Sequence, residues 1–265
     1  MLHVTVVLVH GNPETAAIWA PLIDELGRTD VGPVLALSPP GFGAPVPPGF
    51  GATSDDYVAW LAAELESIGE PVDLVGHDWG SNHVVRLACE RPDLVRSWCG
   101  DTAGVFAPGF EWNKSSQIWM TPGAGEEAIA WQLSAGVPGR TALYESLGMT
   151  TEIAQELAVA FDEAMGQCIL NVYRSALPPA WDIWRERLPA AAQRPGLVIV
   201  PTADIYTGSE AQHRWTATRS GADVAVLDGL GHWWMLEQPG LAAQTLLQFW
   251  ANWTDGDCSD SSRQD

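Results

Sequence analysis

One stretch of the chain decides the fold: Leu74-Val75-Gly76-His77-Asp78-Trp79-Gly80-Ser81. The apolar run 72–75 predicts a short buried strand, and apolar residues recur at helical spacing from 82 to 89. The chain therefore turns sharply from strand to helix around Asp78. Gly76 and Gly80 supply room at such a turn, where a side chain would collide with the neighbouring strand or helix. We interpret this stretch as a nucleophile elbow with Asp78 at its tip.

The predicted position of Asp78 favours an ionised carboxylate. The amino end of a helix presents free N–H groups and the positive end of its dipole to a side chain at that point. An ionised, positioned carboxylate is a nucleophile or a base. The simpler interpretation, Asp78 as a helix N-cap, accounts for an Asp before a helix but not for the paired glycines.

Composition limits the classes of partner. The chain has 265 residues, enough for one large α/β domain with an insertion. Its formal net charge of -20 argues against nucleic acid or an anionic membrane surface as a partner. No apolar stretch is long enough to span a bilayer. We expect a small apolar substrate and water as the only partners, and the oligomeric state stays open.

The amino end and the cysteines indicate the compartment. The β-branched run 4–9 lacks a basic leader and a small-residue cleavage site, so it predicts a first strand and no signal peptide. The cysteines lack paired or metal-like spacing; they are Cys89, Cys99, Cys168 and Cys258. We expect reduced thiols in a cytoplasmic protein.

Strand-like and helix-like segments alternate along the chain. The expected strands are 4–9, 33–37, 72–75, 94–99, 196–200 and 224–227, and the expected helices include 15–26, 54–68 and 241–253. Nearly all of the strands are apolar throughout, which is typical of a mostly parallel sheet with helices on both faces. The fold class is therefore α/β.

A long segment without strand signals interrupts this alternation after the fourth predicted strand. We expect a core in two parts, 1–104 and 191–254, with a helical cap inserted at 105–190 and a disordered tail at 255–265. The chain has 14 tryptophans, and those of the inserted segment predict a large aromatic-lined cavity for an apolar molecule; they are Trp112, Trp119, Trp131, Trp181 and Trp184.

Other polar residues fall at the ends of predicted strands. His232 follows the sixth strand in the loop Gly231-His232-Trp233, and Asp204 follows the fifth. A carboxylate that orients a histidine, which in turn activates water, completes a catalytic triad with Asp78. Asp101, after the fourth strand, is the alternative orienting acid. Taken alone, His232 is better explained as a structural histidine; the three residues together favour catalysis.

These motifs resemble a known family. His10-Gly11-Asn12-Pro13, Gly76-His77-Asp78-Trp79-Gly80, Asp204 and Gly231-His232-Trp233 are similar to the α/β-hydrolase fold, in its aspartate-nucleophile branch of haloalkane dehalogenases and epoxide hydrolases. The resemblance covers residues 3–254. Members usually have a strand hairpin before the strand that leads to His-Gly, whereas this chain begins directly with that strand.

An aspartate nucleophile implies a two-step reaction. A carboxylate that displaces a leaving group from saturated carbon becomes an ester. Water activated by His232 then attacks the carbonyl carbon of Asp78 and releases an alcohol. The N–H groups of Trp79 and Asn12 are expected to hold the oxyanion of this second step. This chemistry requires no metal and no cofactor.

The leaving group separates two alternatives. A halide needs only N–H donors, and the resemblance to haloalkane dehalogenases implies Trp79 with Asn12, or Trp131 from the cap. An epoxide yields an alkoxide, for which the epoxide hydrolases offer two cap tyrosines. Tyr173 matches the second tyrosine site, whereas the first holds Trp131. An indole donates a hydrogen bond but is not an acid at ordinary pH.

The sequence favours a haloalkane dehalogenase first and an epoxide hydrolase second. His232 followed by Trp233 is closer to the epoxide hydrolases. A protein of a different class, which binds a small ligand without catalysis, would be favoured by a broken triad, but all three triad residues are present.

Overall fold

The computed structural model describes residues 4–253. Six strands form one sheet: β1 Val6–Val9, β2 Val34–Leu37, β3 Val72–Gly76, β4 Val95–Gly100, β5 Gly196–Pro201 and β6 Asp223–Leu227. All neighbouring pairs are parallel, and the order is β2-β1-β3-β4-β5-β6. The parallel α/β class expected from the apolar strands is confirmed.

Helices connect the strands. The α-helices are α1 Ala20–Leu26, α2 Ser54–Ile68, α3 Trp79–Glu90, α4 Lys114–Met120, α5 Ala124–Ser134, α6 Gly136–Ser146, α7 Thr151–Ala160, α8 Glu163–Ser175, α9 Ala180–Arg187, α10 Glu210–Ser220, α11 Trp234–Glu237 and α12 Pro239–Ala251. Short 3-10 helices are η1 Ala16–Trp19, η2 Pro92–Leu94, η3 Ala103–Phe106 and η4 Leu188–Gln193. In the described residues, no helix is both long and apolar enough to cross a membrane.

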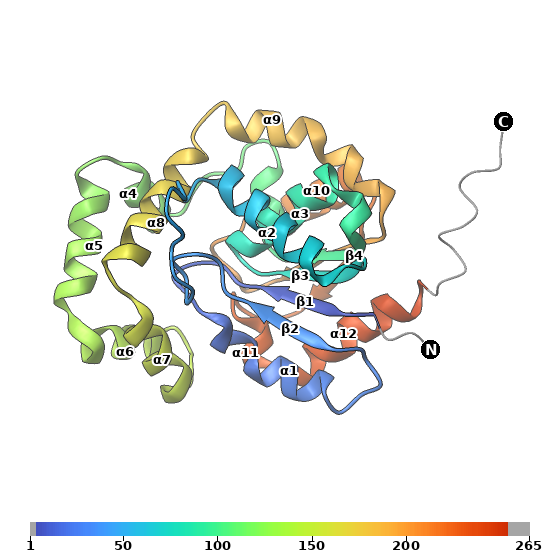
Figure 1. Cartoon of the computed structure of the whole chain (residues 1–265), viewed down its shortest axis with the longest axis horizontal. Helices are drawn as coiled ribbons and strands as arrows, with labels where there is room; N and C mark the ends of the chain where they lie inside the picture. The colour runs from blue at the N-terminus through green and yellow to red at the C-terminus, as the bar shows by residue number, and fades with distance from the viewer. Residues whose placement is uncertain (1–3, 254–265) are drawn as a thin grey trace.

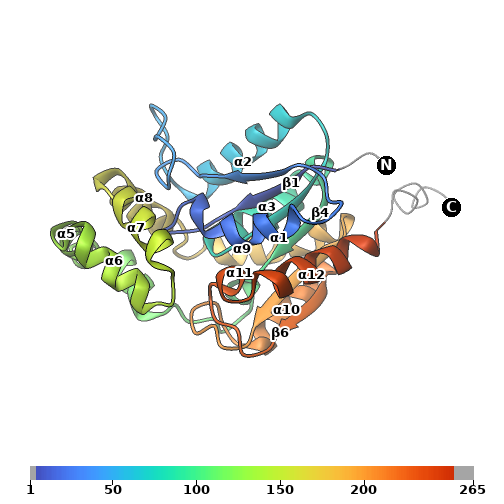
Figure 2. The same ribbon diagram turned by 90° about the horizontal axis from the view of Figure 1, so that it is seen from below.

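The two faces of the sheet carry separate cores. Successive residues of a strand point to opposite faces, so Val7 and Val9 pack in one cluster while Val6 and Leu8 pack in the other. The first cluster includes buried residues of α2, α3 and α10, and the second includes those of α1, α11 and α12. Figures 1 and 2 show helices on both sides of the strands.

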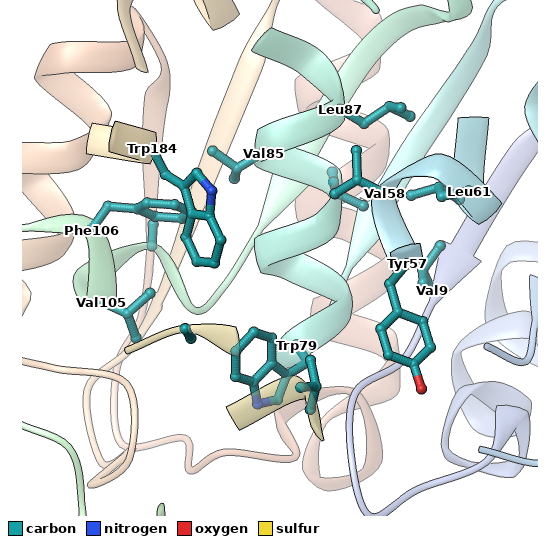
Figure 3. Packing of buried hydrophobic residues seen from close by; sticks show 14 of the residues in the cluster. Val9, Tyr57, Val58, Leu61, Trp79, Val85, Leu87, Val105, Phe106 and Trp184 are labelled. Atoms are coloured by element: carbon teal, nitrogen blue, oxygen red, sulfur yellow. The ribbon is translucent and has the colours of Figure 1, made fainter. Parts of the chain in front are cut away.

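Helix α3 lies at the centre of the first core. Every residue from Trp79 to Ala88 is buried, which is typical of a helix surrounded by protein on all sides. Figure 3 shows Val85 and Leu87 of α3 among side chains of α2, the end of β1 and η3. This packing fixes the start of α3, and with it Asp78, against the sheet.

The sheet topology indicates where a ligand can bind. The chain passes from β1 to β2 on one side and then returns to β3 on the other side of β1. In open α/β sheets, ligands bind outside the carboxyl ends of the strands at such a point of reversal. The residue pairs Val9–Gly76 and Gly76–Gly100 are in register, so the loops after β1, β3 and β4 begin side by side.

The helices α4–α9 fill the segment between β4 and β5, and no strand occurs there within the described residues. Figure 1 shows α4–α8 beyond the end of the sheet. We call α4–α9 the cap helices. The insertion after the fourth strand is confirmed, whereas the boundaries 105–190 stay a prediction and the expected disordered tail lies outside the described residues.

Several boundaries differ from the sequence prediction. The single helix expected at 15–26 is divided into η1 and α1, because Pro21 lies in the first turn of α1 and lacks the N–H that a continuous helix would use. The last helix spans Pro239–Ala251, two residues earlier than the predicted start, with Pro239 in its first turn. The sheet has no strand before β1 in the described residues.

Candidate active site

Asp78 occupies a sharp turn between β3 and α3. Its backbone has φ 51° and ψ -124°, a region that residues with a side chain rarely adopt and that costs about 1–3 kcal/mol. A Cβ on Gly76 would lie 2.5 Å from the Cα of Ser81, and a Cβ on Gly80 would collide with the carbonyl oxygen of Val9. Only glycine fits at both positions, as the elbow interpretation requires.

Two hydrogen bonds fix Asp78 in the turn. Its backbone N–H donates to Oδ1 of Asp101 at 3.1 Å, and its own Oδ1 accepts from the N–H of Asn12 at 3.1 Å. Burial raises the pKa of Asp78, as does the charge of Glu14, whereas the positive charge of His232 opposes them. The carboxylate thus lies in a site where water is scarce and its charge is poorly solvated, which favours nucleophilic attack.

His232 and Asp204 form a hydrogen-bonded pair beside Asp78. Nδ1 of His232 lies 2.8 Å from Oδ2 of Asp204. The same carboxylate accepts from the N–H of Tyr206 at 2.7 Å and from the hydroxyl of Thr207 at 3.1 Å. Asp204 is therefore held on the loop after β5 and directs the other ring nitrogen of His232 toward Asp78.

The second nitrogen of His232, Nε2, lies 3.8 Å from Oδ2 of Asp78. This distance is longer than a direct hydrogen bond, and such bonds are often long in the absence of substrate. Burial lowers the pKa of His232, but the charge and hydrogen bond of Asp204, together with the charge of Asp78, outweigh burial and the net shift is upward. Burial likewise raises the pKa of Asp204, and the charge and hydrogen bond of His232 bring it below its ordinary value.

Asp101, the alternative acid, has different partners. Its Oδ2 accepts from Nδ1 of His77 at 2.5 Å and from the indole of Trp234 at 2.7 Å. Its Oδ1 accepts from the N–H of Asp78 and from the hydroxyl of Thr102. Both oxygens of the Asp101 carboxylate are occupied by these contacts, and none of them involves His232. The idea that Asp101 orients His232 is therefore wrong in this structure. Sequence could not separate the two acids because both follow adjacent strands.

Glu14 is a site residue that the sequence analysis missed. It is buried; its carboxylate accepts from the indole of Trp233 at 2.5 Å and lies 3.3 Å from Nε2 of His77. Burial raises its pKa, but the neighbouring histidines outweigh burial and lower the pKa to about 2. The only feature of the sequence that could have indicated Glu14 is its position directly after Asn12-Pro13. The pattern of apolar and polar residues does not indicate that this carboxylate is buried.

Glu14, His77 and His232 present ligand atoms within 4.8 Å of one another. One observation argues against a metal there. Burial lowers the pKa of His77, but Asp101 and Glu14 outweigh it and raise that pKa well above its ordinary value, and a protonated imidazole cannot coordinate a metal. The cluster is better explained as an ionic network beneath the elbow.

A cavity of about 220 Å³ lies between the sheet edge and the cap helices. Core loops contribute Asn12, Pro13, Glu14, Asp78, Tyr206, His232 and Trp233, and the cap side contributes Asn113, Ser115, Trp119, Gln132, Leu143, Tyr144, Leu147, Met149 and Tyr173. The cavity is therefore mixed, with apolar walls and a few polar groups. Its size limits a ligand to a small molecule.

A larger and more open groove, of about 540 Å³, lies outside this cavity. It is lined mainly by Glu152, Gln155, Glu156 and Val159 of α7 with residues of the core loops. We call it the outer groove. Because it contains none of the strand-end residues that lie around Asp78, the smaller cavity is the candidate active site.

The candidate leaving-group residues do not all reach the cavity. Asn12 and Tyr173 line it, but among the described residues the lining includes neither Trp79 nor Trp131. Trp131 is 63% exposed, so its predicted role as a cap donor is wrong. Helical spacing did not reveal which face of α5 turns inward; Gln132, one position later, lines the cavity instead.

Tyr173, on α8, lines the same cavity as Asp78. Burial is the main cause that raises its pKa, and the charge of Asp78 adds to it, whereas the side chains of Ser116 and Trp79 act in the opposite direction. The phenol therefore stays protonated at neutral pH beside Asp78. Its ring contacts that of Trp79 edge to face, with centroids 5.1 Å apart.

The tryptophans serve mainly in packing. Trp79 contacts Trp112, Tyr173 and Trp181, and Trp181 contacts Trp184 in turn. We call these five residues the aromatic cluster. Of the five cap tryptophans expected to line a cavity, only Trp119 does so in the described structure. The expectation of an aromatic-lined cavity is thus corrected, because most indoles pack between the cap and α3.

Comparison with known proteins identifies the family. A model of the alpha/beta hydrolase family matches residues 6–245, nearly the whole described chain. The chain belongs to this family. The geometry agrees with the assignment, since the nucleophile elbow of an α/β-hydrolase is a strand-to-helix turn with its tip at the carboxyl edge of the sheet.

Individual relatives of this α/β-hydrolase carry two kinds of name. A haloalkane dehalogenase from Bradyrhizobium diazoefficiens is 35% identical over 34% of the chain, which spans only 29% of that relative. Epoxide hydrolase A from Mycobacterium tuberculosis is 28% identical over 92% of the chain and 89% of the relative. A laboratory-evolved variant of potato epoxide hydrolase has a similar fold, with a TM-score of 0.75 at 19% identity over 95% of this chain and 93% of that chain.

Proposed function

We propose that this α/β-hydrolase forms a covalent ester on Asp78 and hydrolyses it with water activated by His232, and that its leaving group is an epoxide oxygen. The observation that carries the choice of epoxide is the protonated hydroxyl of Tyr173 in the cavity, near the carboxylate of Asp78. Such a pair can attack a carbon and protonate the departing oxygen in one step.

In the first step, a carboxylate oxygen of Asp78 forms a bond to an epoxide carbon and the carbon–oxygen bond of the ring breaks. Oδ2 is suited to the attack, since Oδ1 accepts the hydrogen bond of Asn12. The oxygen that leaves takes the proton of Tyr173. A phenol is far more acidic than an alcohol, so this transfer is favourable even though burial raises the pKa of Tyr173.

In the second step, His232 removes a proton from water, and the resulting hydroxide attacks the carbonyl carbon of the Asp78 ester. The N–H of Asn12 and the N–H of Trp79, the first residue of α3, stabilise the oxyanion. Breakdown of this intermediate expels the diol oxygen, which takes the proton held by His232, and a vicinal diol leaves. The proton of the Asp78 carboxyl group then returns to the phenolate of Tyr173, so both side chains regain their starting states. Asp204 stabilises the imidazolium that forms in between. Epoxide and water are the only reactants.

Dehalogenation is the second candidate, and one observation favours it. The side-chain amide of Asn12 is buried beside Asp78, and neither Nδ2 nor Oδ1 has a hydrogen-bond partner among the described residues. Nδ2 can donate to a halide. A second donor is less evident, because Trp131 is exposed and the indole of Trp79 packs in the aromatic cluster. We therefore rank epoxide hydrolysis above dehalogenation.

A binding protein without catalysis fits the site less well, because Asp78, His232 and Asp204 lie together in the order that hydrolysis needs. We also propose that the protein acts in the cytoplasm on a small molecule. The cysteines in the described residues, Cys89, Cys99 and Cys168, are unpaired, which fits a reducing compartment.

The test uses a trapped intermediate. His232→Gln protein is mixed separately with styrene oxide and with 1-bromobutane, and the intact protein and the peptide that contains Asp78 are weighed. An adduct from the epoxide supports the proposal. An adduct from the bromide alone, with bromide released, would reverse the ranking, and normal turnover by His232→Gln would overturn the mechanism.

A further inference from the structure

Two buried polar atoms on the cap side of the cavity have no role in the proposed mechanism. Oε1 of Gln132, on α5, and the hydroxyl of Tyr144, on α6, lack hydrogen-bond partners among the described residues. Both residues line the same cavity as Asp78. A buried polar atom without a partner destabilises a folded protein, so each of them requires an explanation.

The nearest cation does not satisfy either atom. The guanidinium of Arg140 donates from Nη1 to the backbone carbonyl of Gln132 at 2.8 Å and from Nε to that of Ala158 at 3.0 Å. Arg140 thereby holds the end of α5 against α6 and α7, and no described group pairs with Oε1 of Gln132 or the hydroxyl of Tyr144.

The proposal, which rests on the proposed function, concerns the substrate class. We propose that Gln132 and Tyr144 bind a neutral hydroxyl substituent on the substrate, so that the preferred substrate is a small epoxide that carries an alcohol. A hydroxyl can donate to Oε1 of Gln132 and accept from the O–H of Tyr144 with a single atom. A purely hydrocarbon substrate would leave both atoms unpaired.

The charges around the cavity favour a neutral group over an anion. Asp78 and Glu14 both line the cavity, and an anionic substituent would be repelled by them. Burial raises the pKa of Tyr144, and the charge of Glu14 acts in the same direction although Arg140 opposes it. The phenol of Tyr144 therefore keeps its proton and remains a hydrogen-bond donor.

The size of the cavity fits this class. About 220 Å³ is below the range of cavities that bind drug-sized ligands. Leu143, Leu147 and Met149 supply apolar wall beside Tyr144, so the carbon skeleton has apolar contacts while the hydroxyl meets the two polar atoms. This arrangement, a mainly apolar wall with few polar groups, is how small-molecule sites fix orientation.

The experiment varies two features of the substrate independently: the leaving group, which is an epoxide or a bromide, and the substituent, which is an alcohol or an alkyl group. His232→Gln protein is treated with 2,3-epoxy-1-propanol, 1,2-epoxybutane, 3-bromo-1-propanol and 1-bromobutane, and the rate of adduct formation on Asp78 is divided by the rate of each compound with acetate in buffer. The rates of the epoxides compared with those of the bromides test the proposed function. The rate of each alcohol compared with that of its alkyl partner tests the substrate class, for epoxides and for bromides alike.

We expect each alcohol to react about tenfold or more faster than its alkyl partner, which corresponds to one or two hydrogen bonds. Adding Gln132→Leu or Tyr144→Phe should abolish most of this preference by slowing the alcohol alone. Gln155→Leu, the same replacement on the outer groove, should keep the preference. Thermal melting of every variant confirms folding.

Equal rates of adduct formation for the alcohol and its alkyl partner in the His232→Gln protein would overturn the inference. A preference for the alcohol that persists in both Gln132→Leu and Tyr144→Phe would also overturn it. Reaction of the bromides alone with the preference intact would overturn epoxide chemistry and keep the alcohol site. No adduct from any of the four compounds would overturn both.

Discussion

The rings of His77 and His232 lie with their centroids 4.5 Å apart, and Nδ1 of each ring faces a carboxylate of its own. Asp101 is the partner of His77 at 2.5 Å, and Asp204 is the partner of His232 at 2.8 Å. Only His232 lines the cavity, with Nε2 near Asp78. Two Asp–His pairs therefore stand side by side, one in the elbow support and one in the proposed catalytic machinery.

Replacement of Asp204 and replacement of Asp101 should have different effects on activity and stability. We expect Asp204→Asn to slow hydrolysis of the Asp78 ester by roughly 10³–10⁴-fold, the scale known for the acid of serine triads. Asp101→Asn removes one charge of a buried pair, so it should lower the free energy of unfolding by about 3–5 kcal/mol. Single-turnover rates and urea unfolding separate the two, and the opposite assignment of effects would make Asp101 the triad acid.

Hydrolysis of the ester should depend on the protonation of His232. The base must be neutral, and Asp204 raises the pKa of His232 above its ordinary 6.5. The rate of ester hydrolysis should therefore fall as the pH falls through the pKa of His232, which Asp204 raises. Asp204→Asn removes the cause of the upward shift, so the midpoint should move to lower pH. A midpoint that stays in place when Asp204 is changed would exclude His232 as the titrating group.

Tyr173 and Asn12 should separate the two leaving groups. Tyr173→Phe removes the acid and should slow adduct formation from an epoxide by about 10²–10⁴-fold, while a bromoalkane, which needs no proton, reacts at the parent rate. Asn12→Ala removes the amide Nδ2 and should slow the bromoalkane and weaken bromide binding. Quenched-flow mass spectrometry with each substrate gives these rates, and equal slowing of both substrates by Tyr173→Phe would argue against proton donation.

Close backbone approach makes Gly80 irreplaceable. A Cβ there would collide with the carbonyl oxygen of Val9, whereas a Cβ on Gly240 in α12 meets no atom within 4 Å. Gly80→Ala should therefore shift α3 away from β1, lower the free energy of unfolding by about 1–3 kcal/mol and abolish activity. Gly240→Ala should raise stability by up to about 1 kcal/mol. Urea unfolding and turnover of both proteins provide the comparison; tolerance of Gly80→Ala would contradict the geometry of the elbow.

Much of this site could be predicted because the backbone conformation of a turn depends mainly on neighbouring residues in the sequence. The spacing Gly76, Asp78, Gly80 specifies a strained turn, and strand ends bring Asp78, Asp204 and His232 to one edge of a parallel sheet. Strand periodicity and turn residues do not depend on distant partners, so the order of elements was also predictable. The rules for connections between parallel strands leave few possible strand orders, and the observed order with its reversal at β1 is one of them.

The directions of cap side chains could not be predicted in the same way. Trp131 and Gln132 are adjacent on α5, yet the indole points to solvent and the amide to the cavity. Helix α5 has no strong apolar face to decide its rotation, so tertiary packing decides. Glu14 was missed for a related reason, since its burial depends on Trp233 and His77, which come from distant parts of the chain.

The aromatic cluster has a consequence for protein engineering. Trp79 belongs to the core, directly after Asp78, but its ring packs on Trp112, Tyr173 and Trp181, which lie beyond β4. A cap transplanted from another hydrolase would leave this indole without its neighbours and would disturb the turn that presents the nucleophile. Cap and elbow are therefore not interchangeable modules; they have to be inherited, or redesigned, together.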